Sequence, residues 1–194
     1  MPSASAHVYS DPNCPFCYAL EERLHALALH EAVEWRGVQH APHLPVPMVV
    51  AAGPLALELP HEVASIRARA PEVAITTPPG KPNTAQAITW AAAAQRVSPH
   101  GARGFIRSLY PALWRDGLDL SDPGVLTQLA TAAGLPELRP TDDDRARAAD
   151  WQRGWAQLGA GGVPLLARLD GATLYGLADT DELARFLTSE PVAP

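Results

Sequence analysis

The sequence predicts an α/β fold that carries one helical insertion, and three observations support this. The first forty residues follow a strand–helix–strand pattern, residues from about 58 to 158 have helical patterns, and the chain then returns to a hairpin and a last helix. Because the first and last segments can share one sheet, we expect a single domain over residues 1–194. Its core would consist of residues 1–57 and 159–194, and residues 58–158 would form the insertion.

Two strands are expected on either side of a first helix. "HVYS" (7–10) is rich in β-forming residues, and "AVEWRGV" (32–38) alternates apolar and polar side chains. Between them, apolar residues recur at helical spacing: Phe16, Leu20, Leu24 and Leu27. Pro15 suits the first turn of this helix, since its missing N–H costs nothing there. Cys14 is therefore expected at the helix N-terminus, and Cys17 about one turn inside it.

The insertion is expected to contain five helices with recognisable ends. They are residues 61–70, 83–97, 101–117, 121–134 and 141–159. Asn83 and Thr84 are candidate caps of the second helix, and Asp122 of the fourth. Pro111 should kink or split the third helix, because an internal proline loses a backbone hydrogen bond. The three acids after Thr141 suit the positive end of the last helix dipole.

The C-terminal part of the chain is predicted to be a hairpin and a helix. "PLLARL" (164–169) and "ATLYGL" (172–177) are strand-like and are joined by the turn pair "DG". A helix over residues 179–187 would begin with a capping box of Asp179 and Glu182.

The segment "GAGGVPLL" (159–166) leads into the hairpin. Its glycines provide a flexible approach, and Pro164 fixes the turn before the strand. The bond before Pro164 is a candidate for the cis form. An ordinary proline between a loop and a strand is the alternative.

Composition excludes several classes of protein. Apolar residues make up 47% of the chain and charged residues 19%, which excludes a disordered chain. The net charge of −6 argues against nucleic-acid binding, which favours a basic face. No apolar run approaches the ~20 residues of a membrane helix, and "MPSASAHVYSDPN" lacks the basic and apolar regions of a secretory signal. We therefore expect a cytoplasmic protein, whose thiols are kept reduced.

The two cysteines of the chain lie three positions apart in "DPNCPFCYALEERL" (11–24), and they could be a redox couple, half of a zinc site or two buried thiols. Zinc with this spacing normally needs a second ligand pair. Only His40 and His43 form a close histidine pair, on a proline-rich loop, so no metal is expected. A redox couple is favoured, because the N-terminus of a helix stabilises the thiolate of Cys14 and Cys17 can resolve a mixed disulfide.

Two polar residues precede the cysteine motif. The carboxylate of Asp11 could raise the pKa of Cys14 by its charge, but a role as cap of the turn "DPN" is favoured. His7 is interpreted as a strand histidine that faces solvent or a neighbouring side chain.

These motifs resemble the DsbA-like branch of the thioredoxin superfamily, in particular FrnE-like proteins and relatives of 2-hydroxychromene-2-carboxylate isomerase. The resemblance is carried by "CPFC" after a strand, by "KPNTAQAITWAAAA" and "LYPALWRDGLDLSDPGVLTQLATAAGL", and by "GGVPLLARLDGATLYG". It covers nearly the whole chain. It implies a thioredoxin-like fold, with the helical insertion between the second strand and the cis-proline strand, and thiol–disulfide oxidoreductase activity.

The resemblance also implies roles for individual residues. Cys14 matches the exposed nucleophile of the family, and Cys17 matches the resolving cysteine. Pro164 would be cis, so that the backbone before it can pair with an extended substrate, as in strand addition. The implied substrate-binding residues are Pro15, Phe16, Val163 and Pro164.

The motif departs from the family in the residue at position 16. The periplasmic oxidants of the family have Pro-His between their cysteines, whereas this chain has Pro15-Phe16. Because Phe16 offers no charge, we expect a less depressed pKa of Cys14 and a less oxidising couple than in those enzymes. The isomerase branch usually has serine in place of the first cysteine, so Cys14 favours dithiol chemistry.

The implied partners are a disulfide-containing protein or small-molecule substrate and a separate thiol reductant, with neither nucleic acid nor a membrane. No tightly bound cofactor is expected, and glutathione is a candidate co-substrate. An alternative is a glutathione-dependent isomerase or transferase of a small aromatic substrate. The insertion and the segment "HAPHLPVPM" could form the walls of its pocket. Trp90, Phe105 and Trp114 are candidate lining residues, but packing in the core is favoured for each of them. A third reading is a non-enzymatic partner protein with a vestigial cysteine pair.

Overall fold

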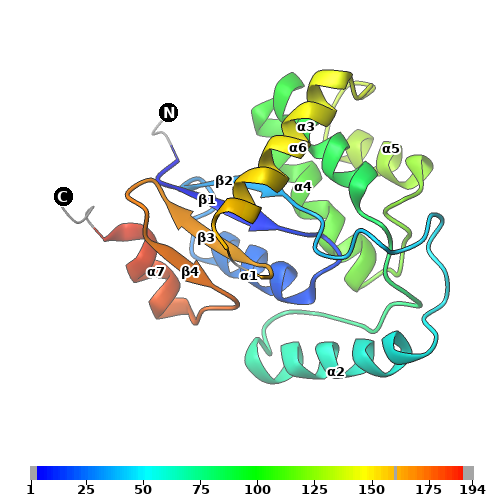
Figure 1. The fold of residues 1–194 in the computed structure, drawn as a ribbon, viewed down its shortest axis with the longest axis horizontal. Coiled ribbons are helices and arrows are strands. Elements are labelled where there is room, and N and C mark those ends of the chain that lie inside the picture. Colours follow the sequence, from blue (N-terminus) through cyan, green and yellow to red (C-terminus); the bar gives the residue numbers. More distant parts are fainter. Residues whose placement is uncertain (1–3, 160, 190–194) are drawn as a thin grey trace.

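The computed structural model of the protein describes residues 4–159 and 161–189, and a four-stranded sheet lies at its centre (Figure 1). The strands are β1 (Ala6–Ser10), β2 (Val33–Gly37), β3 (Leu165–Arg168) and β4 (Thr173–Tyr175), in the order β2-β1-β3-β4. β1 pairs in parallel with β2 and antiparallel with β3, and β3 pairs antiparallel with β4. Segments from both ends of the chain therefore share one sheet, as predicted. The predicted domain also includes residues 1–3, 160 and 190–194, which lie outside the described residues.

Seven helices accompany the sheet in the described part of the chain. They are α1 (Pro15–Ala26), α2 (Pro54–Arg69), α3 (Ala85–Val97), α4 (Pro99–Trp114), α5 (Pro123–Ala132), α6 (Asp142–Gln157) and α7 (Thr180–Thr188). In Figure 1, α3 to α6 gather into one group beside the sheet, α2 lies apart from that group, and α7 lies beside β4. Because α2 to α6 all fall between β2 and β3, the predicted α/β fold with a helical insertion is confirmed. No helix among the described residues is long and apolar enough to cross a membrane.

Two helices of the insertion run through internal prolines. α2 begins at Pro54, well before the predicted start at residue 61, and continues through Pro60. Of the predicted kink or split at Pro111, the split is wrong, because α4 continues through Pro111 to Trp114. Both helices bury an apolar face, which includes Leu59, Val63 and Ile66 in α2 and Leu109, Tyr110 and Leu113 in α4. This packing outweighs the single backbone hydrogen bond that each proline removes.

Most of the predicted helix caps are present. Asp122 accepts a hydrogen bond from the Gly124 N–H (2.7 Å) at the start of α5, and Asp179 accepts one from the Glu182 N–H (2.8 Å) at the start of α7, which is one half of the predicted capping box. Of the two candidates for α3, Asn83 accepts a hydrogen bond from the Ala85 N–H (3.1 Å), whereas Thr84 occupies the N-cap position but makes no cap bond there. It donates to the buried carboxylate of Asp11 instead (2.8 Å), so this residue serves the site described below.

Asp144 ties α6 to α3 and is expected to contribute to stability. The Arg96 guanidinium donates two hydrogen bonds to its carboxylate (both 2.9 Å), and Thr141 adds a capping box. The bonds from Arg96 and the Thr141 backbone lower the pKa of Asp144 to about 2. Asp144→Asn should therefore destabilise the protein by about 1–2 kcal/mol at pH 7. The expected loss is kept this small because Arg96 is half-exposed, so solvent screens its ion pair with Asp144.

The same contribution should vanish in acid. A carboxyl whose folded pKa lies below its ordinary value stabilises the fold fully above that ordinary value, and the stability is lost as the pH falls through about 2. Urea unfolding at pH 7 and at pH 2 would measure it, with the exposed neighbour Asp143→Asn as the matched control. Equal effects of the two substitutions at pH 7 would contradict the role of Asp144.

The largest fully buried side chains lie on α4. They are Trp114, Tyr110 and Phe105, and Trp90 of α3 is buried in the same core. Core packing of Trp90, Phe105 and Trp114 is therefore confirmed. The Trp114 indole N–H also donates to the Pro12 carbonyl (2.9 Å), which anchors the loop that precedes the cysteines.

Candidate active site

The two cysteines lie where the sequence predicts them. Cys14 is the N-cap of α1 with an extended backbone, Pro15 is the first helical residue, and Cys17 lies in the first turn. Both are free thiols. Cys14 is only 5% exposed and Cys17 only 1%. The nucleophile expected from the family is thus recessed in this structure, because the loops around it cover its sulfur.

The two thiols have opposite pKa shifts. A hydrogen bond from Cys17 and the charge of His40 lower the pKa of Cys14, against the effect of burial. Burial and the neighbouring Cys14 raise the pKa of Cys17 well above its usual range. The lowered pKa of Cys14 favours its thiolate form, which a hydrogen bond from Cys17 stabilises, whereas the raised pKa of Cys17 favours its thiol form.

A buried carboxylate and a histidine flank the cysteines. The Asp11 side chain is 0% exposed, and its Oδ2 accepts hydrogen bonds from the Nδ1 (2.8 Å) and the backbone N–H (3.0 Å) of His40. Its Oδ1 accepts bonds from the Thr84 hydroxyl (2.8 Å) and the Asn13 N–H (3.2 Å). The predicted cap of the turn "DPN" is therefore confirmed, but this carboxylate also holds a residue from a distant loop.

His40 supplies the positive charge that Phe16 cannot. Burial disfavours its imidazolium form, but the hydrogen bond and the charge of Asp11 outweigh burial and raise the pKa of His40. The imidazolium in turn lowers the pKa of Cys14, whereas the charge of Asp11 opposes that effect. When protonated, His40 thus places near Cys14, from the loop after β2, a positive charge that the Pro15-Phe16 pair does not provide.

Sequence reasoning missed this role of His40, although a signal for it exists. The sequence suggested His40 only as one of two candidate zinc ligands, with His43. The parallel strands β1 and β2 end together, since Ser10 pairs with Gly37. Residues just after parallel strands meet at one edge of the sheet, so Asp11 and His40 are brought together there. Among the described residues no three His, Cys, Asp or Glu side chains are placed to hold a metal.

A polar cluster surrounds the sulfur of Cys17. The Asp11 N–H lies 3.5 Å from the sulfur, and a hydrogen bond from Ser10 partly offsets the raised pKa of Cys17. The Ser10 hydroxyl is 2.5 Å from the Tyr110 hydroxyl, which also accepts a bond from the Trp35 indole (2.9 Å). Burial raises the pKa of Tyr110 well above its usual range, so its hydroxyl stays protonated. This cluster gives the buried thiol hydrogen-bonding partners that an apolar core would lack.

The segment before β3 faces the cysteines from the opposite side. The Val163–Pro164 peptide bond is cis, and the Cys14 sulfur lies 3.6 Å from the Val163 carbonyl oxygen. The Trp155 indole donates to the Gly162 carbonyl (3.1 Å) and fixes this segment against α6. Of "GAGGVPLL", Ala160 lies outside the described residues. A second cis bond, which the sequence patterns do not indicate, joins Val46 and Pro47.

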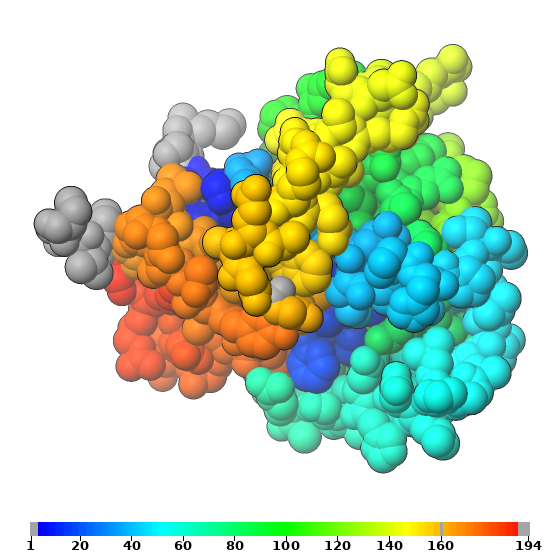
Figure 2. Space-filling view, viewed as in Figure 1, coloured from blue at the N-terminus to red at the C-terminus, as the bar shows by residue number. Residues whose placement is uncertain are grey.

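Phe16, between the two cysteines, contacts a residue of the insertion. It is half-buried, and the Arg69 guanidinium of α2 lies over its ring, 5.5 Å from the centroid. In Figure 2 a small dark-blue area from the N-terminal part of the chain is visible between the orange segment of β3, the light-blue loop after β2 and the teal α2, so these three segments meet the N-terminal part on this face. His7 bonds to Arg36 on β2, as a strand histidine with a neighbour.

Comparison with known families gives one match that spans the chain. Residues 7–188 match the family described as the DSBA-like thioredoxin domain. No protein with a curated description matches the sequence.

Solved structures share the fold at low sequence identity. A probable DsbA oxidoreductase from Streptomyces coelicolor is 20% identical with a TM-score of 0.71, over 94% of this chain and 88% of that one. The cytosolic disulfide reductase DsbM from Pseudomonas aeruginosa is 21% identical with a TM-score of 0.63, over 95% and 92% of the two chains, and was also solved with GSH. A 2-hydroxychromene-2-carboxylate isomerase is 15% identical with a TM-score of 0.66, over 93% and 91%. At these identities the likeness shows the fold.

Proposed function

Because the chain belongs to the family of DsbA-like thioredoxin domains, we propose that it is a thiol–disulfide oxidoreductase that uses Cys14 and Cys17 as its redox couple. The observation that carries the proposal is the position of Cys14 at the N-cap of α1, with its sulfur 3.6 Å from the Val163 carbonyl oxygen of the cis-proline segment. The opposite pKa shifts of the two thiols, lowered for Cys14 and raised for Cys17, support it. Thiol–disulfide exchange needs this asymmetry, since the thiolate is the nucleophile and the second thiol must wait until the mixed disulfide has formed.

The proposed reaction has two exchanges. The Cys14 thiolate attacks one sulfur of a substrate disulfide, the substrate's S–S bond breaks, and one substrate thiolate leaves. Cys17 then loses its proton and attacks the Cys14 sulfur of the mixed disulfide, which releases the second substrate thiolate. The substrate gains two electrons, and the protein is left with a Cys14–Cys17 disulfide.

Substrate would bind across the Val163–Pro164 segment. The Val163 carbonyl is already beside the Cys14 sulfur, and an extended cysteine-containing segment could pair with this backbone as an added strand. Pro15 and Phe16 would contact the substrate on the side of α1. Both protein disulfides and small disulfides fit this proposal.

Recycling requires an external thiol, since the chain has no third cysteine. We propose glutathione or a separate thiol reductant in the cytoplasm for this role, and no tightly bound cofactor. The likeness to DsbM, which is described as cytosolic and was solved with GSH, supports this choice.

The reduction potential of the cysteine pair tests the proposal. The protein would be equilibrated with glutathione buffers of graded ratio, and the oxidised fraction would be read by alkylation and mass. A potential near that of thioredoxin, about −270 mV, would identify a reductase, and one near about −120 mV an oxidant. Failure to form a Cys14–Cys17 disulfide at any ratio would contradict the proposal and favour a vestigial pair.

A glutathione-dependent isomerase is the second candidate, and its support is the fold shared with 2-hydroxychromene-2-carboxylate isomerase. One observation weakens it, because the aromatic residues that could have lined its pocket, Trp90, Phe105 and Trp114, are buried in the core. Saturable glutathione binding without any dithiol turnover would favour this candidate over the first.

A further inference from the structure

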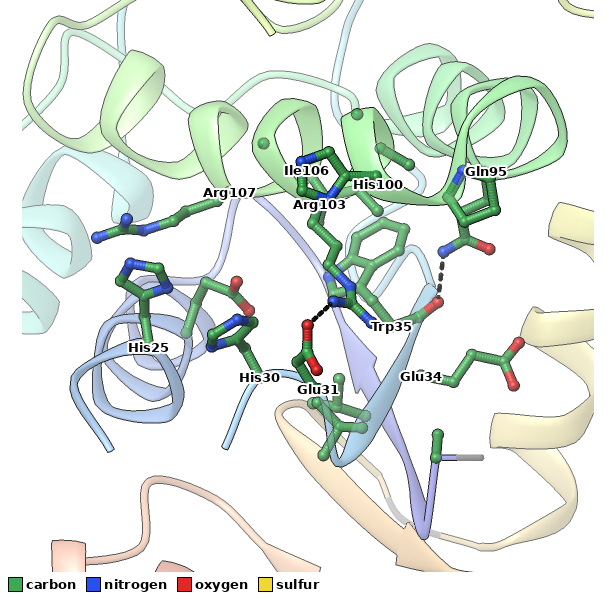
Figure 3. A pocket seen from close by; sticks show the side chains of 18 of the residues that line it. His25, His30, Glu31, Glu34, Trp35, Gln95, His100, Arg103, Ile106 and Arg107 are labelled. Carbon is green, nitrogen blue, oxygen red and sulfur yellow. Dashed lines mark hydrogen bonds and ion pairs between the residues drawn. The ribbon is translucent and has the colours of Figure 1, made fainter. Parts of the chain in front are cut away.

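A cleft of about 620 Å³ lies between the C-terminal half of α1, β2 and the first half of α4 (Figure 3). Its apolar lining includes Val8, Val33, Trp35 and Ile106. Its described lining residues include neither cysteine, nor His40, nor the Val163–Pro164 segment, so the cleft is separate from the redox site. Its volume lies in the range of small-molecule sites.

The cationic groups of the cleft already have partners. The ion pairs are Arg103–Glu31 (2.5 Å), Arg107–Glu22 (3.2 Å) and Arg147–Glu34 (3.6 Å). Figure 3 shows the first of these spanning the cleft between α4 and the loop before β2. An anionic ligand would have to compete with these carboxylates for the arginines.

Two other polar groups of the cleft lack such partners. In the described part of the chain no group donates a hydrogen bond to the Glu21 carboxyl, and burial raises its pKa to about 7 against the opposing charge of Arg107. The Nδ1 atom of His30 is buried without a hydrogen-bond partner. Since buried polar groups are normally satisfied, His30 is suited to a ligand that carries polar atoms of its own, and the half-buried carboxyl of Glu21 lines the same cleft.

Aromatic surface lies beside these two groups. The rings of His25 and His30 are in contact, with centroids 5.0 Å apart, and both point into the cleft in Figure 3. Trp35 lines the cleft from β2. A flat ring system could stack against the two histidine rings.

We propose that this cleft binds a planar, nitrogen-rich aromatic molecule with adjacent N–H donors, of the cyclic amidine or aminoheterocycle class. Glu21 accepts the paired N–H groups, in the bidentate way that carboxylates bind such forks. His30 exchanges a further hydrogen bond with the ring. The site is independent of the cysteines and does not rest on the proposed redox function.

Titration calorimetry with 2-aminobenzimidazole, which has the required fork of donors, tests this site. We expect saturable binding to the wild-type protein and about tenfold weaker binding to Glu21→Gln, which loses a charge-assisted bond. The matched control is Glu58→Gln on α2, the same substitution at an exposed glutamate, which should not alter binding. Amide shifts in the NMR spectrum should centre on residues 21–35 and 95–107.

A second variant and a second ligand complete this binding test. His30→Ala should also weaken binding, and it replaces Glu21→Gln if melting shows that variant to be unfolded. Indole-2-carboxylate, an anion of similar size and shape, should bind more weakly than 2-aminobenzimidazole. The proposal would be overturned by absence of binding, by equal binding to the folded variants, by preference for the anion, or by amide shifts centred on Cys14.

Discussion

In a disulfide-reduction assay, Cys14→Ser should lower turnover to the uncatalysed background, a loss of more than about 10³-fold. The serine hydroxyl stays protonated at neutral pH, so it cannot replace the thiolate that the N-terminus of α1, Cys17 and His40 stabilise at this position. Cys17→Ser should behave differently. It keeps the attacking thiolate but cannot release the substrate, so a mixed disulfide should accumulate and be visible by mass spectrometry in the absence of added thiol.

Both variants need a folding control, because both thiols are buried. Serine at position 17 would place a hydroxyl beside Ser10 and Tyr110, which can hydrogen-bond to it, so the fold should tolerate the change. Melting temperatures close to that of the wild type would establish this. Turnover that persists undiminished in folded Cys14→Ser would exclude the proposed chemistry.

Replacing His40 with glutamine should raise the pKa of Cys14, because the substitution removes one nearby positive charge that favours the thiolate. The rate of alkylation by iodoacetamide at pH 6 should fall about tenfold, in proportion to the thiolate fraction. The ultraviolet absorbance of the thiolate, followed through a pH titration, gives the pKa directly.

His43→Gln is the matched control for this substitution. His43 lies on the same loop but is exposed, and of these two histidines it is His40 that contacts the Asp11 carboxylate. The effect of His40 on the thiolate of Cys14 should also depend on pH. Since the pKa of His40 is raised above 6.5, its support of the thiolate is complete below that value and is lost as the pH rises through the raised pKa. Equal alkylation rates in the two variants would contradict the role of His40.

The parts of the site that could be predicted from the sequence are those set by local pattern. "CPFC" before an apolar helical stripe places Cys14 at a helix N-terminus, and "GGVPLL" before a hairpin identifies Pro164. The neighbours of the sulfurs depend instead on tertiary contacts. Ser10 and Tyr110 meet across 100 positions of sequence, and Thr84 reaches Asp11 across 73. No local pattern records such pairs.

The inference from Phe16 shows the same limit. A neutral residue between the cysteines removes one source of positive charge, and this much follows from the motif alone. The motif cannot show that a histidine after β2 takes over the charge, because this depends on the register of two parallel strands. The helix boundaries around Pro60 and Pro111 differ from prediction for a related reason, since burial of neighbouring residues overrides the local cost of proline.

The contact between Cys14 and Val163 joins positions 149 residues apart, with the whole insertion between them. During synthesis the ribosome therefore releases the cysteines long before the segment that faces them. Until Leu165 to Arg168 add to the sheet beside β1, the nascent chain has two thiols without their cis-proline partner. The cysteines therefore reach their full reactivity only late in translation. A truncated chain that ends within the insertion would contain the cysteine motif but not the complete site.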